Sequence, residues 1–484
     1  MKLRDFLTAL VILAIPLTFQ LQAVAQPPDS EGPDFLASVV SDGDGIYVAG
    51  HTSPPGSHLI DAIIARLDDD GTPLWTATID NGFWDQFDDL AILPGGDIVA
   101  VGASGTNEAG NYNALLARYT ADGDLLWSQQ IETAAWDAAT GVKVDPNGGL
   151  WISGHSAATG SQDQDMLLIR ADADGDTLYT RIFEHGNHDF ALDIALTQDG
   201  GAVLAGFLVD NGDYDRDVVL IRVDSEGDSV WERIVELPLP NDAHSIVSLD
   251  DGGFAVAGLT HLHNEDGEDE SDALLMRFDG EGNLLWWEAY GGAGFDEAWD
   301  LSVTPSGGYI VAGFSESDDN PYPQAWTFTT DGSGTLLSTS MQGGPGTDQA
   351  RGIAALGGNE YALVGFTMPG DGADNNFLFT RVLDTGVQSG EPYLYPTEFL
   401  LQAFPNPFNS FLSVKVQLPR YSRMQVSVFN ILGQRICTLA DANLPAKTHT
   451  FAFDADRLSS GIYIIQARAG DGSMEQTMRV TLLR

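Results

Sequence analysis

Six residues with oxygen-bearing side chains recur along this chain at nearly constant spacing and could act on a ligand together. They lie 52, 52, 52, 55 and 52 residues apart, at Asp85, Asp137, Asp189, Asn241, Asp296 and Asp348. Aromatic or imidazole side chains directly precede four of them, at Trp84, Trp136, His188 and Phe295. Carboxylates accept hydrogen bonds from sugar hydroxyls, and aromatic faces stack on the apolar face of a pyranose ring. The pattern predicts a site for a glycan or a protein, or for a cation where the carboxylates converge.

The same repetition has a structural interpretation, which stays open at this stage. Aspartate and asparagine side chains often stabilise turns by accepting backbone N–H bonds, and a turn repeated in every unit would repeat its cap. Under this interpretation the acidic residues position the loops, and only the aromatic neighbours remain available to a ligand.

Two further clusters could hold a metal. The turns at Asp68–Gly71 and Asp172–Asp176 place oxygen atoms on alternate residues beside a glycine, as calcium loops do. Neither continues into a full calcium-binding loop, and Asp-Gly is an ordinary hairpin turn. His261, His263 and the acidic residues at 266 and 268–270 are interpreted as solvated charge rather than a transition-metal site. No cofactor is predicted, and calcium is the alternative.

The chain carries no motif that announces catalysis. A nucleophile elbow, a zinc-binding helix and a phosphate-binding loop are all missing from the sequence. The one cysteine, Cys437, excludes intramolecular disulfides and is interpreted as a small core residue. A binding protein is therefore favoured over an enzyme.

The elements that position these residues follow from an internal repeat. A glycine that closes a short apolar strand recurs at Gly50, Gly102, Gly154, Gly206, Gly258, Gly313 and Gly365. Each unit contains four short strands separated by Gly/Asp turns, without helical periodicity. Such a sheet cannot bury both faces alone, but a closed ring of sheets can. The sequence predicts an all-β fold, with a seven-bladed β-propeller over residues 26–391.

Two further columns of the repeat predict how the blades hold together. Large aromatics occupy the fourth strand at Trp75, Trp127, Tyr179, Trp231 and Trp286, and we expect them to wedge between blades. Arginines occupy the third strand at Arg66, Arg118, Arg170, Arg222, Arg277 and Arg381, and we expect them to pair with carboxylates. The seventh unit lacks its fourth strand, for which residues 387–391 and the mature N-terminus are the two candidates.

Charge divides the chain into two parts. Residues 26–391 contain 11 basic and 63 acidic side chains, whereas residues 392–484 contain 9 and 6. So negative a field repels nucleic acids and anionic membranes. It is compatible with cations, neutral glycans or basic protein surfaces.

The N-terminus predicts export. Lys2 and Arg4 precede an apolar run at residues 6–17, and Ala23-Val24-Ala25 offers a cleavage site for a signal peptide of residues 1–25. No later segment reaches the length of about 20 apolar residues that a membrane helix needs, so no transmembrane segment is predicted in the mature chain.

The repeats resemble uncharacterised bacterial propeller repeats, as residues 251–258 and 272–286 show. The segment from the third to the fourth strand is also similar to quinoprotein-type repeats. These resemblances imply the fold and leave the activity open.

Three motifs near the C-terminus resemble the type A sorting domain of type IX secretion. They lie at residues 403–409, 428–434 and 458–463, and their principal residues are Pro405, Asn406, Pro407, Gly433, Gly461 and Tyr463. The resemblance implies an Ig-like β-sandwich at residues 392–484 that engages the type IX machinery and directs the protein from the periplasm to the cell surface or the medium. An ordinary Ig-like accessory module is the alternative.

These observations favour a secreted or cell-surface binding propeller that recognises a glycan or a protein through an acidic, aromatic loop face. An exported enzyme with its site in the propeller funnel is the alternative, either a glycan hydrolase or lyase or a quinoprotein-like oxidoreductase. The funnel is expected to be poor in arginine and lysine, which disfavours a quinone cofactor. A structural surface-layer component is the third hypothesis.

Overall fold

The computed structural model describes most of the chain between Asp34 and Leu483, together with Gln22 and Ala23. The described ranges are 22–23, 34–53, 59–105, 111–133, 136–158, 163–185, 188–209, 216–235, 237, 239–263, 269–292, 294–317, 320–368, 375–384, 399–404, 406–409, 411–418, 422–444, 448–455, 458–469 and 474–483. Within them the regular elements are strands only. The expectation for the signal peptide falls almost entirely outside these ranges.

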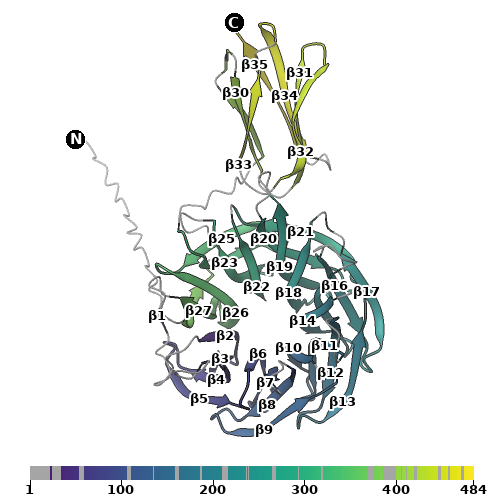
Figure 1. Ribbon diagram of the computed structural model, residues 1–484, viewed down its shortest axis with the longest axis vertical. Coiled ribbons are helices and arrows are strands. Elements are labelled where there is room, and N and C mark those ends of the chain that lie inside the picture. Colours follow the sequence, from purple (N-terminus) through teal and green to yellow (C-terminus); the bar gives the residue numbers. More distant parts are fainter. Residues whose placement is uncertain are drawn as a thin grey trace, which may run out of the picture.

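Seven antiparallel sheets form a ring, in which the first strand of each sheet lies nearest the axis (Figure 1). A single parallel bridge between Trp136 and Tyr112 also joins the second and third sheets. The first sheet contains β2 (Phe35–Ser41), β3 (Ile46–Thr52), β4 (Asp61–Leu67) and β5 (Pro73–Ile79). The second contains β6 (Asp85–Ile92), β7 (Ile98–Gly105), β8 (Tyr112–Tyr119) and β9 (Leu125–Ile131). The third contains β10 (Trp136–Val144), β11 (Leu150–Ala157), β12 (Asp165–Ala171) and β13 (Thr177–Phe183).

The remaining sheets repeat this order. The fourth contains β14 (His188–Leu196), β15 (Ala202–Val209), β16 (Arg216–Val223) and β17 (Ser229–Val235). The fifth contains β18 (Asn241–Ser248), β19 (Phe254–His263), β20 (Asp269–Phe278) and β21 (Leu284–Tyr290). The sixth contains β22 (Asp296–Val303), β23 (Tyr309–Ser315), β24 (Gln324–Thr330) and β25 (Leu336–Gln342), and the seventh contains β26 (Thr347–Gly357), β27 (Glu360–Met368) and β28 (Asn376–Leu383). The predicted seven-bladed propeller is confirmed.

The repeated glycines exist because every innermost strand carries a bulge opposite them. In the second sheet the register shifts between Phe87 and Asp89, directly beside Gly102. A Cβ atom on Gly102 would lie 2.1 Å from the carbonyl oxygen of Gln86, and the other six glycines meet the same obstacle. The bulge turns the residue between the shifted pairs toward the axis, which matters for the site described below.

The aromatic column packs between blades, as expected. The Trp75 ring lies against the turn glycine of the next blade, Gly123, and its indole N–H donates to the carbonyl of Ala121 at 3.0 Å. Four further pairs repeat this packing from one blade to the next: Trp127 with Gly175, Tyr179 with Gly227, Trp231 with Gly282 and Trp286 with Gly334. Where the ring closes, Phe379 of β28 packs on Gly71 of the first blade instead.

Replacing Gly123 with alanine tests this packing. The residue has φ of +91°, and its added Cβ would meet the Trp75 ring at 2.6 Å. We expect a loss of about 2–4 kcal/mol, because left-handed strain and overpacking add. Gly96→Ala is the control for strain, since Gly96 has φ of +87° and open space, and should cost about 1 kcal/mol. Equal shifts of the unfolding midpoint in the two variants would show that the contact with Trp75 contributes nothing.

The arginine column is paired with carboxylates, which confirms that expectation in five of the six positions. Arg118 contacts Asp97 of its own blade at 2.7 Å and Asp174 of the next blade at 3.7 Å. Arg170, Arg222, Arg277 and Arg381 likewise contact acidic residues. Arg66 donates to the carbonyl oxygen of Asp44 instead, at 3.0 Å.

The seventh sheet takes its fourth strand from the N-terminal side of the chain. The short strand β1 (Gln22–Ala23) pairs antiparallel with Phe379 and Leu378 of β28. Of the two expected sources, residues 387–391 lie outside the described residues. The N-terminal source is supported in direction, but residues 22–23 precede the expected cleavage site after Ala25 rather than follow it. Cleavage there would remove β1 from the ring.

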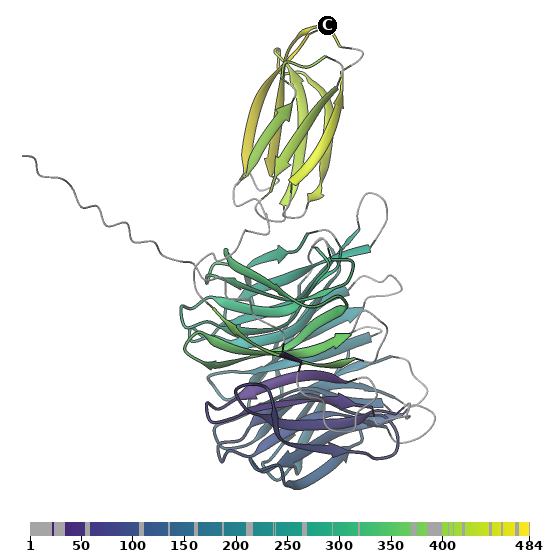
Figure 2. The same cartoon turned by 90° about the vertical axis from the view of Figure 1, so that its left-hand side faces the viewer.

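The C-terminal residues form a two-layer sandwich, drawn as a separate body in Figure 2. One sheet has the order β29 (Leu400–Phe404), β30 (Phe411–Gln417) and β33 (Thr448–Asp454). The other has the order β32 (Arg435–Leu444), β31 (Ser422–Asn430), β34 (Gly461–Ala469) and β35 (Glu475–Leu482). The two sheets share one apolar core, against which Cys437 packs half-buried as expected.

The residues of the sorting motifs shape this sandwich. Asn406 ties the first motif to β35, because its amide donates to the Arg479 carbonyl at 3.1 Å and its oxygen accepts the Thr481 N–H at 2.9 Å. Pro407 follows it on the surface, and Pro405 lies outside the described residues. Gly433 has φ of +75° in the turn before β32. Gly461 begins β34, and the buried Tyr463 donates its hydroxyl to the Ser459 carbonyl at 2.9 Å.

Candidate functional site

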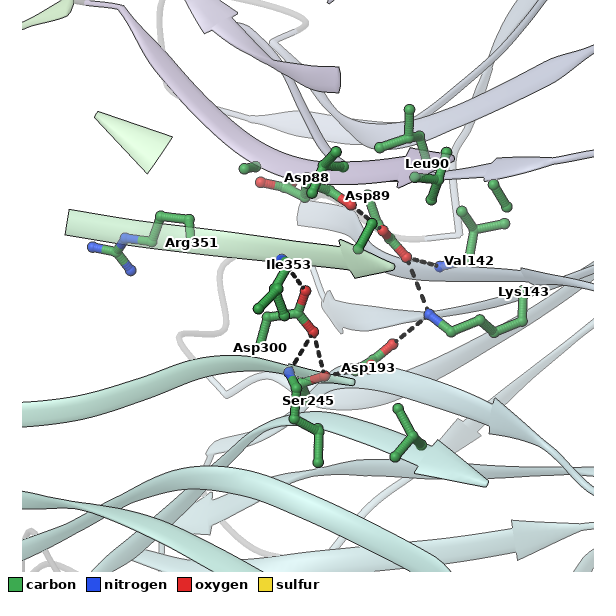
Figure 3. Close-up of a pocket in the computed structure, with 18 of the residues that line it drawn as sticks. Asp88, Asp89, Leu90, Val142, Lys143, Asp193, Ser245, Asp300, Arg351 and Ile353 are labelled. Carbon is green, nitrogen blue, oxygen red and sulfur yellow. Dashed lines mark hydrogen bonds and ion pairs between the residues drawn. The ribbon is translucent and has the colours of Figure 1, made fainter. Parts of the chain in front are cut away.

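The seven innermost strands surround a cavity of about 520 Å³ on the axis of the ring. Its walls come from β2, β6, β10, β14, β18, β22 and β26, and Figure 3 shows the polar side chains that line it. The cavity is concave and lined by both apolar and charged side chains, as is usual for ligand sites.

Two levels of side chains around the axis differ from blade to blade. The throat level consists of the bulged residues, which are Ala37, Asp88, Thr140, Leu192, His244, Trp299 and Arg351. The mouth level lies two residues earlier on the same side of each strand and consists of Phe35, Gln86, Ala138, Phe190, Asp242, Glu297 and Gln349. The columns that build the fold keep one residue type, whereas these two do not. Their variety is what a site for an asymmetric ligand requires.

One strand carries a continuous polar path from the surface into the cavity. The Trp84 side chain is 56% exposed, and its indole N–H donates to Gln86 at 2.8 Å. The Gln86 amide in turn donates to both oxygens of Asp88, at 2.7 and 3.0 Å. Burial raises the pKa of Asp88 to about 7, since the amide of Gln86 compensates the charge only in part. An aromatic face directly before β6 is thus followed by a carboxamide and a carboxyl group on that strand.

A cluster of stacked side chains occupies the same two levels on the fifth, sixth and seventh blades. The Trp299 ring lies between the His244 ring, at 4.2 Å, and the Arg351 guanidinium, at 3.5 Å. Its indole N–H donates to Glu297 at 3.1 Å, and Arg351 donates to Gln349 at 2.7 Å. Burial lowers the pKa of His244 to about 4, so this imidazole is neutral at physiological pH.

The pKa values of two carboxyl groups of the mouth level are shifted in opposite directions. Asp242 accepts a bond from Arg216 at 2.6 Å. Burial works to raise its pKa, but His261, His244 and Arg216 together hold it below its ordinary value. Burial raises the pKa of Glu297, which only Arg351, Trp299 and His261 oppose. Environments that separate two carboxyl groups in this way are found where one acts as an acid and the other as a base.

Below the throat, one lysine neutralises two carboxylates. The Lys143 ammonium lies 3.0 Å from Asp193 and 3.4 Å from Asp89 (Figure 3). Burial works to lower its pKa, yet Asp193 and Asp89 outweigh burial and raise it. Lys143 and Arg351 are the two basic residues that line the cavity, against four aspartates, Asp88, Asp89, Asp193 and Asp300, in keeping with the expectation of a funnel poor in basic groups.

The aspartates of this lower level also connect blades in pairs. Asp89 accepts the N–H of Val142 at 2.8 Å, which joins the second and third sheets. Asp193 accepts the N–H of Ile246 at 2.9 Å, and Asp300 accepts that of Ile353 at 2.8 Å. These bonds join the fourth sheet to the fifth and the sixth to the seventh.

The acidic column singled out from the sequence lies at the beginning of the innermost strands, where each strand follows the loop between two blades. Each of five carboxylates accepts the backbone N–H of the residue four positions earlier; the five are Asp85, Asp137, Asp189, Asp296 and Asp348. All five are buried, as is Asn241, whose amide donates to the Leu239 carbonyl. These are the bonds of the capping interpretation. A ligand role for these carboxylates stays a prediction.

The aromatic neighbours occupy several environments. Trp84 and Phe295 are exposed. Trp136 is half-buried, stacks on Tyr112 at 5.9 Å and donates to Asn111 at 3.0 Å. His188 is half-buried and forms a parallel bridge with Gln164. Of the predicted aromatic residues, the structure connects Trp84 to the cavity by hydrogen bonds.

The acidic hairpin turns and the histidine-containing loop were the candidate metal sites in the sequence. Asp68 and Asp172 direct one carboxylate oxygen to backbone N–H groups within their own hairpin turns. Residues 264–268 of the histidine-containing loop lie outside the described residues. Within the described part of the chain, no group of three or more histidine, cysteine or acidic side chains has the geometry to hold a metal ion.

The raised pKa of Asp88 predicts how the free energy of unfolding depends on pH. Because its pKa in the folded state lies above the ordinary 3.8, its contribution is present at low pH and is lost as the pH rises through about 7. Asp88→Asn should therefore stabilise the protein by about 2 kcal/mol at pH 8 and leave it unchanged at pH 4. Thermal unfolding at both pH values measures this. An equal shift at pH 4 and pH 8 would contradict it.

Comparison with known proteins adds the identity of the C-terminal domain. Residues 402–481 match the family described as a secretion system C-terminal sorting domain. No curated protein matches the chain by sequence. The part of the chain that the structure describes contains no helix with the length and apolarity needed to cross a membrane.

Among solved structures, the chain is similar in architecture to PorZ, described as a surface component of the type IX secretion system of Porphyromonas gingivalis. The identity is 10%, the TM-score is 0.43, and the similarity covers 97% of this chain and 61% of PorZ. A puromycin hydrolase mutant shares 15% identity over 81% of this chain and 61% of its own, with a TM-score of 0.47. The β-propeller domain of a Pyrococcus furiosus protease shares 10% over 73% and 96%, with a TM-score of 0.41. The chain thus spans about three fifths of the first two proteins, and the likeness is one of fold alone.

The C-terminal domain is a sorting domain of type IX secretion. Proteins that carry it engage this secretion system and are exported to the cell surface or the medium. The expected localisation is confirmed.

Proposed function

We propose that this exported propeller is a carbohydrate-binding protein that holds a glycan at the mouth of its axial cavity. The observation that carries the proposal is the path from exposed Trp84 through Gln86 to Asp88. Glycans are bound by such combinations of an aromatic face with planar hydrogen-bonding groups, because each sugar ring has an apolar face and a rim of hydroxyls. The varied mouth and throat levels supply further donors and acceptors around the same cavity.

Binding of the mature chain to a glycan array, followed by calorimetry, tests the proposal. Trp84→Ala should weaken binding at least tenfold, which corresponds to about 1.4 kcal/mol. The control is Leu178→Ser, which changes an equally exposed apolar side chain on the outer strand β13 and should leave binding unchanged. The proposal fails if no glycan is retained, or if Trp84→Ala binds as tightly as the unaltered chain.

Hydrolysis of the bound glycan is a second candidate, favoured by the contrast between Asp242 and Glu297. In glycoside hydrolysis a protonated carboxyl group donates to the leaving oxygen while an ionised one acts as base or nucleophile. Glu297 would be the acid and Asp242 the ionised partner. Release of new reducing ends that disappears in Glu297→Gln would support this candidate, and intact glycan after prolonged incubation would reject it.

A further inference from the structure

Arg351 is unusual among the cations of the propeller. Residues 26–391 contain 63 acidic and 11 basic side chains, so carboxylate partners are plentiful. Eight of the eleven cations lie within 4 Å of a carboxylate among the described residues; they are Arg118, Lys143, Arg170, Arg181, Arg216, Arg222, Arg277 and Arg381. Arg351 has no such partner in the described structure, although it lines the cavity.

The surroundings of Arg351 fix its guanidinium but do not neutralise it. One face lies 3.5 Å from the Trp299 ring, and the Phe35 ring is 5.4 Å away. One terminal nitrogen donates to Gln349, while Nε is buried without a hydrogen-bond partner. Burial lowers the pKa of Arg351 to about 10, which Glu297 only partly opposes, so the group stays charged at neutral pH. A buried donor left unbonded costs free energy, which a ligand acceptor would recover.

A carboxyl group lies two blades away from Arg351 around the axis. At the throat level Ala37 lies between Arg351 of the seventh blade and Asp88 of the second. Figure 3 shows both charged side chains among the residues that line the cavity. Asp88 accepts bonds from Gln86 alone among the described residues. Arg351 and Asp88 do not come within ion-pair distance of each other. Room is therefore left above the smallest side chain of the throat level, between a cation and a carboxyl group.

We propose that the glycan bound here ends in an acidic sugar, whose carboxylate pairs with Arg351 while its hydroxyls donate to Asp88. A guanidinium with unused N–H groups matches a carboxylate in geometry as well as charge. The inference rests on the proposed function and names the class of sugar that the site selects.

The overall charge of the propeller gives this interaction a distinctive salt dependence. An anionic ligand approaches against a strongly negative field, which salt screens beyond about 8–10 Å, whereas the contact with Arg351 is short and half-buried. Affinity for the acidic glycan should therefore hold or rise as salt increases from about 0.05 to 0.3 M. Attraction to exposed lysines would show the opposite trend.

The test compares a uronate oligosaccharide with the same oligosaccharide after reduction of its carboxyl groups. Calorimetry with the full mature chain should give at least tenfold tighter binding of the uronate. Arg351→Gln should abolish this preference, so that the uronate binds no more tightly than the reduced glycan, and Arg351→Lys should retain part of it. Arg66→Gln is the matched control, because Arg66 also lacks an ion pair but lies on β4, away from the cavity. Unfolding midpoints of all variants report whether they are folded.

Each outcome separates the inference from the proposed function. Equal or tighter binding of the reduced glycan overturns the inference and leaves glycan binding intact. A preference that persists in Arg351→Gln overturns it as well. Failure of both glycans, and of every other glycan on the array, overturns the proposed function itself. If Arg351→Gln does not fold, the Arg351→Lys variant and the salt series of the unaltered chain decide, and a uronate affinity that falls with salt rejects the inference.

Discussion

Deletion of residues 392–484 is expected to leave the propeller in the periplasm. The sorting domain is recognised by the type IX machinery, and the ring of residues 34–384 has its own strands and cores, so it should fold without the sandwich. Cell fractionation and surface protease treatment measure the distribution. We expect surface protein to fall to the background level, a loss of at least tenfold.

A control must show that the truncated chain is folded where it accumulates. Resistance of the periplasmic propeller to limited proteolysis serves this purpose, since an unfolded ring would be degraded. In the reciprocal experiment, residues 392–484 fused behind a periplasmic carrier should bring that carrier to the surface. Normal surface display of the truncated protein would reject the sorting role in this chain.

Replacement of Lys143 with methionine is expected to destabilise the propeller substantially. The substitution removes the ammonium that lies between Asp89 and Asp193 and leaves both carboxylates without their cation. Removing one partner of a buried ion pair typically costs about 3–5 kcal/mol, and because the Lys143 side chain is 35% exposed we expect a loss at the lower end, of about 3 kcal/mol. That is a large part of the roughly 5–15 kcal/mol by which domains are stable.

Two comparisons isolate the electrostatic part of that loss. Lys143→Arg keeps the charge and should cost less than half as much. Arg233→Met removes a cation that has no carboxylate within 4 Å among the described residues; it donates to the carbonyl oxygens of Glu232 and Glu281 and lies 5.2 Å from the Trp231 ring, so its loss should shift the unfolding midpoint little. A loss as large in Lys143→Arg as in Lys143→Met would mean that packing, not charge, is responsible.

The fold was predictable because its requirements repeat. Gly102 and its counterparts must lack a side chain, because an added Cβ would lie about 2 Å from a backbone oxygen. Trp75 and its counterparts must fill the space between sheets. Each constraint acts seven times or nearly so, which makes it visible in one sequence. The source of the fourth strand in the last sheet acts once, and the sequence left two candidates for it.

The cavity was harder to predict for the same reason. Asp85 and its counterparts attracted attention because they recur, and recurrence is the mark of a loop cap. Arg351, Trp299 and Asp88 share one structural position but no residue type, so no repeat identifies them. Aligning the units on Gly102 and asking which column inside a strand never repeats would have found the throat level. Whether Arg351 lies near a carboxylate depends on the position of two side chains in space, which the sequence does not contain.

The odd number of blades has a consequence for how the ring opens. Asp89, Asp193 and Asp300 join the second sheet to the third, the fourth to the fifth and the sixth to the seventh. The first sheet takes no part in these carboxylate pairs: it is joined to the second sheet by the Ser38 hydroxyl, which donates to Asp89, and to the seventh by the Asp34 N–H to the Asn375 carbonyl and by Arg381 to Asp69. Transient opening of the ring is therefore expected to begin at β2–β5, beside the sheet that β1 completes. Amide hydrogens there should exchange with solvent before those of the six coupled sheets.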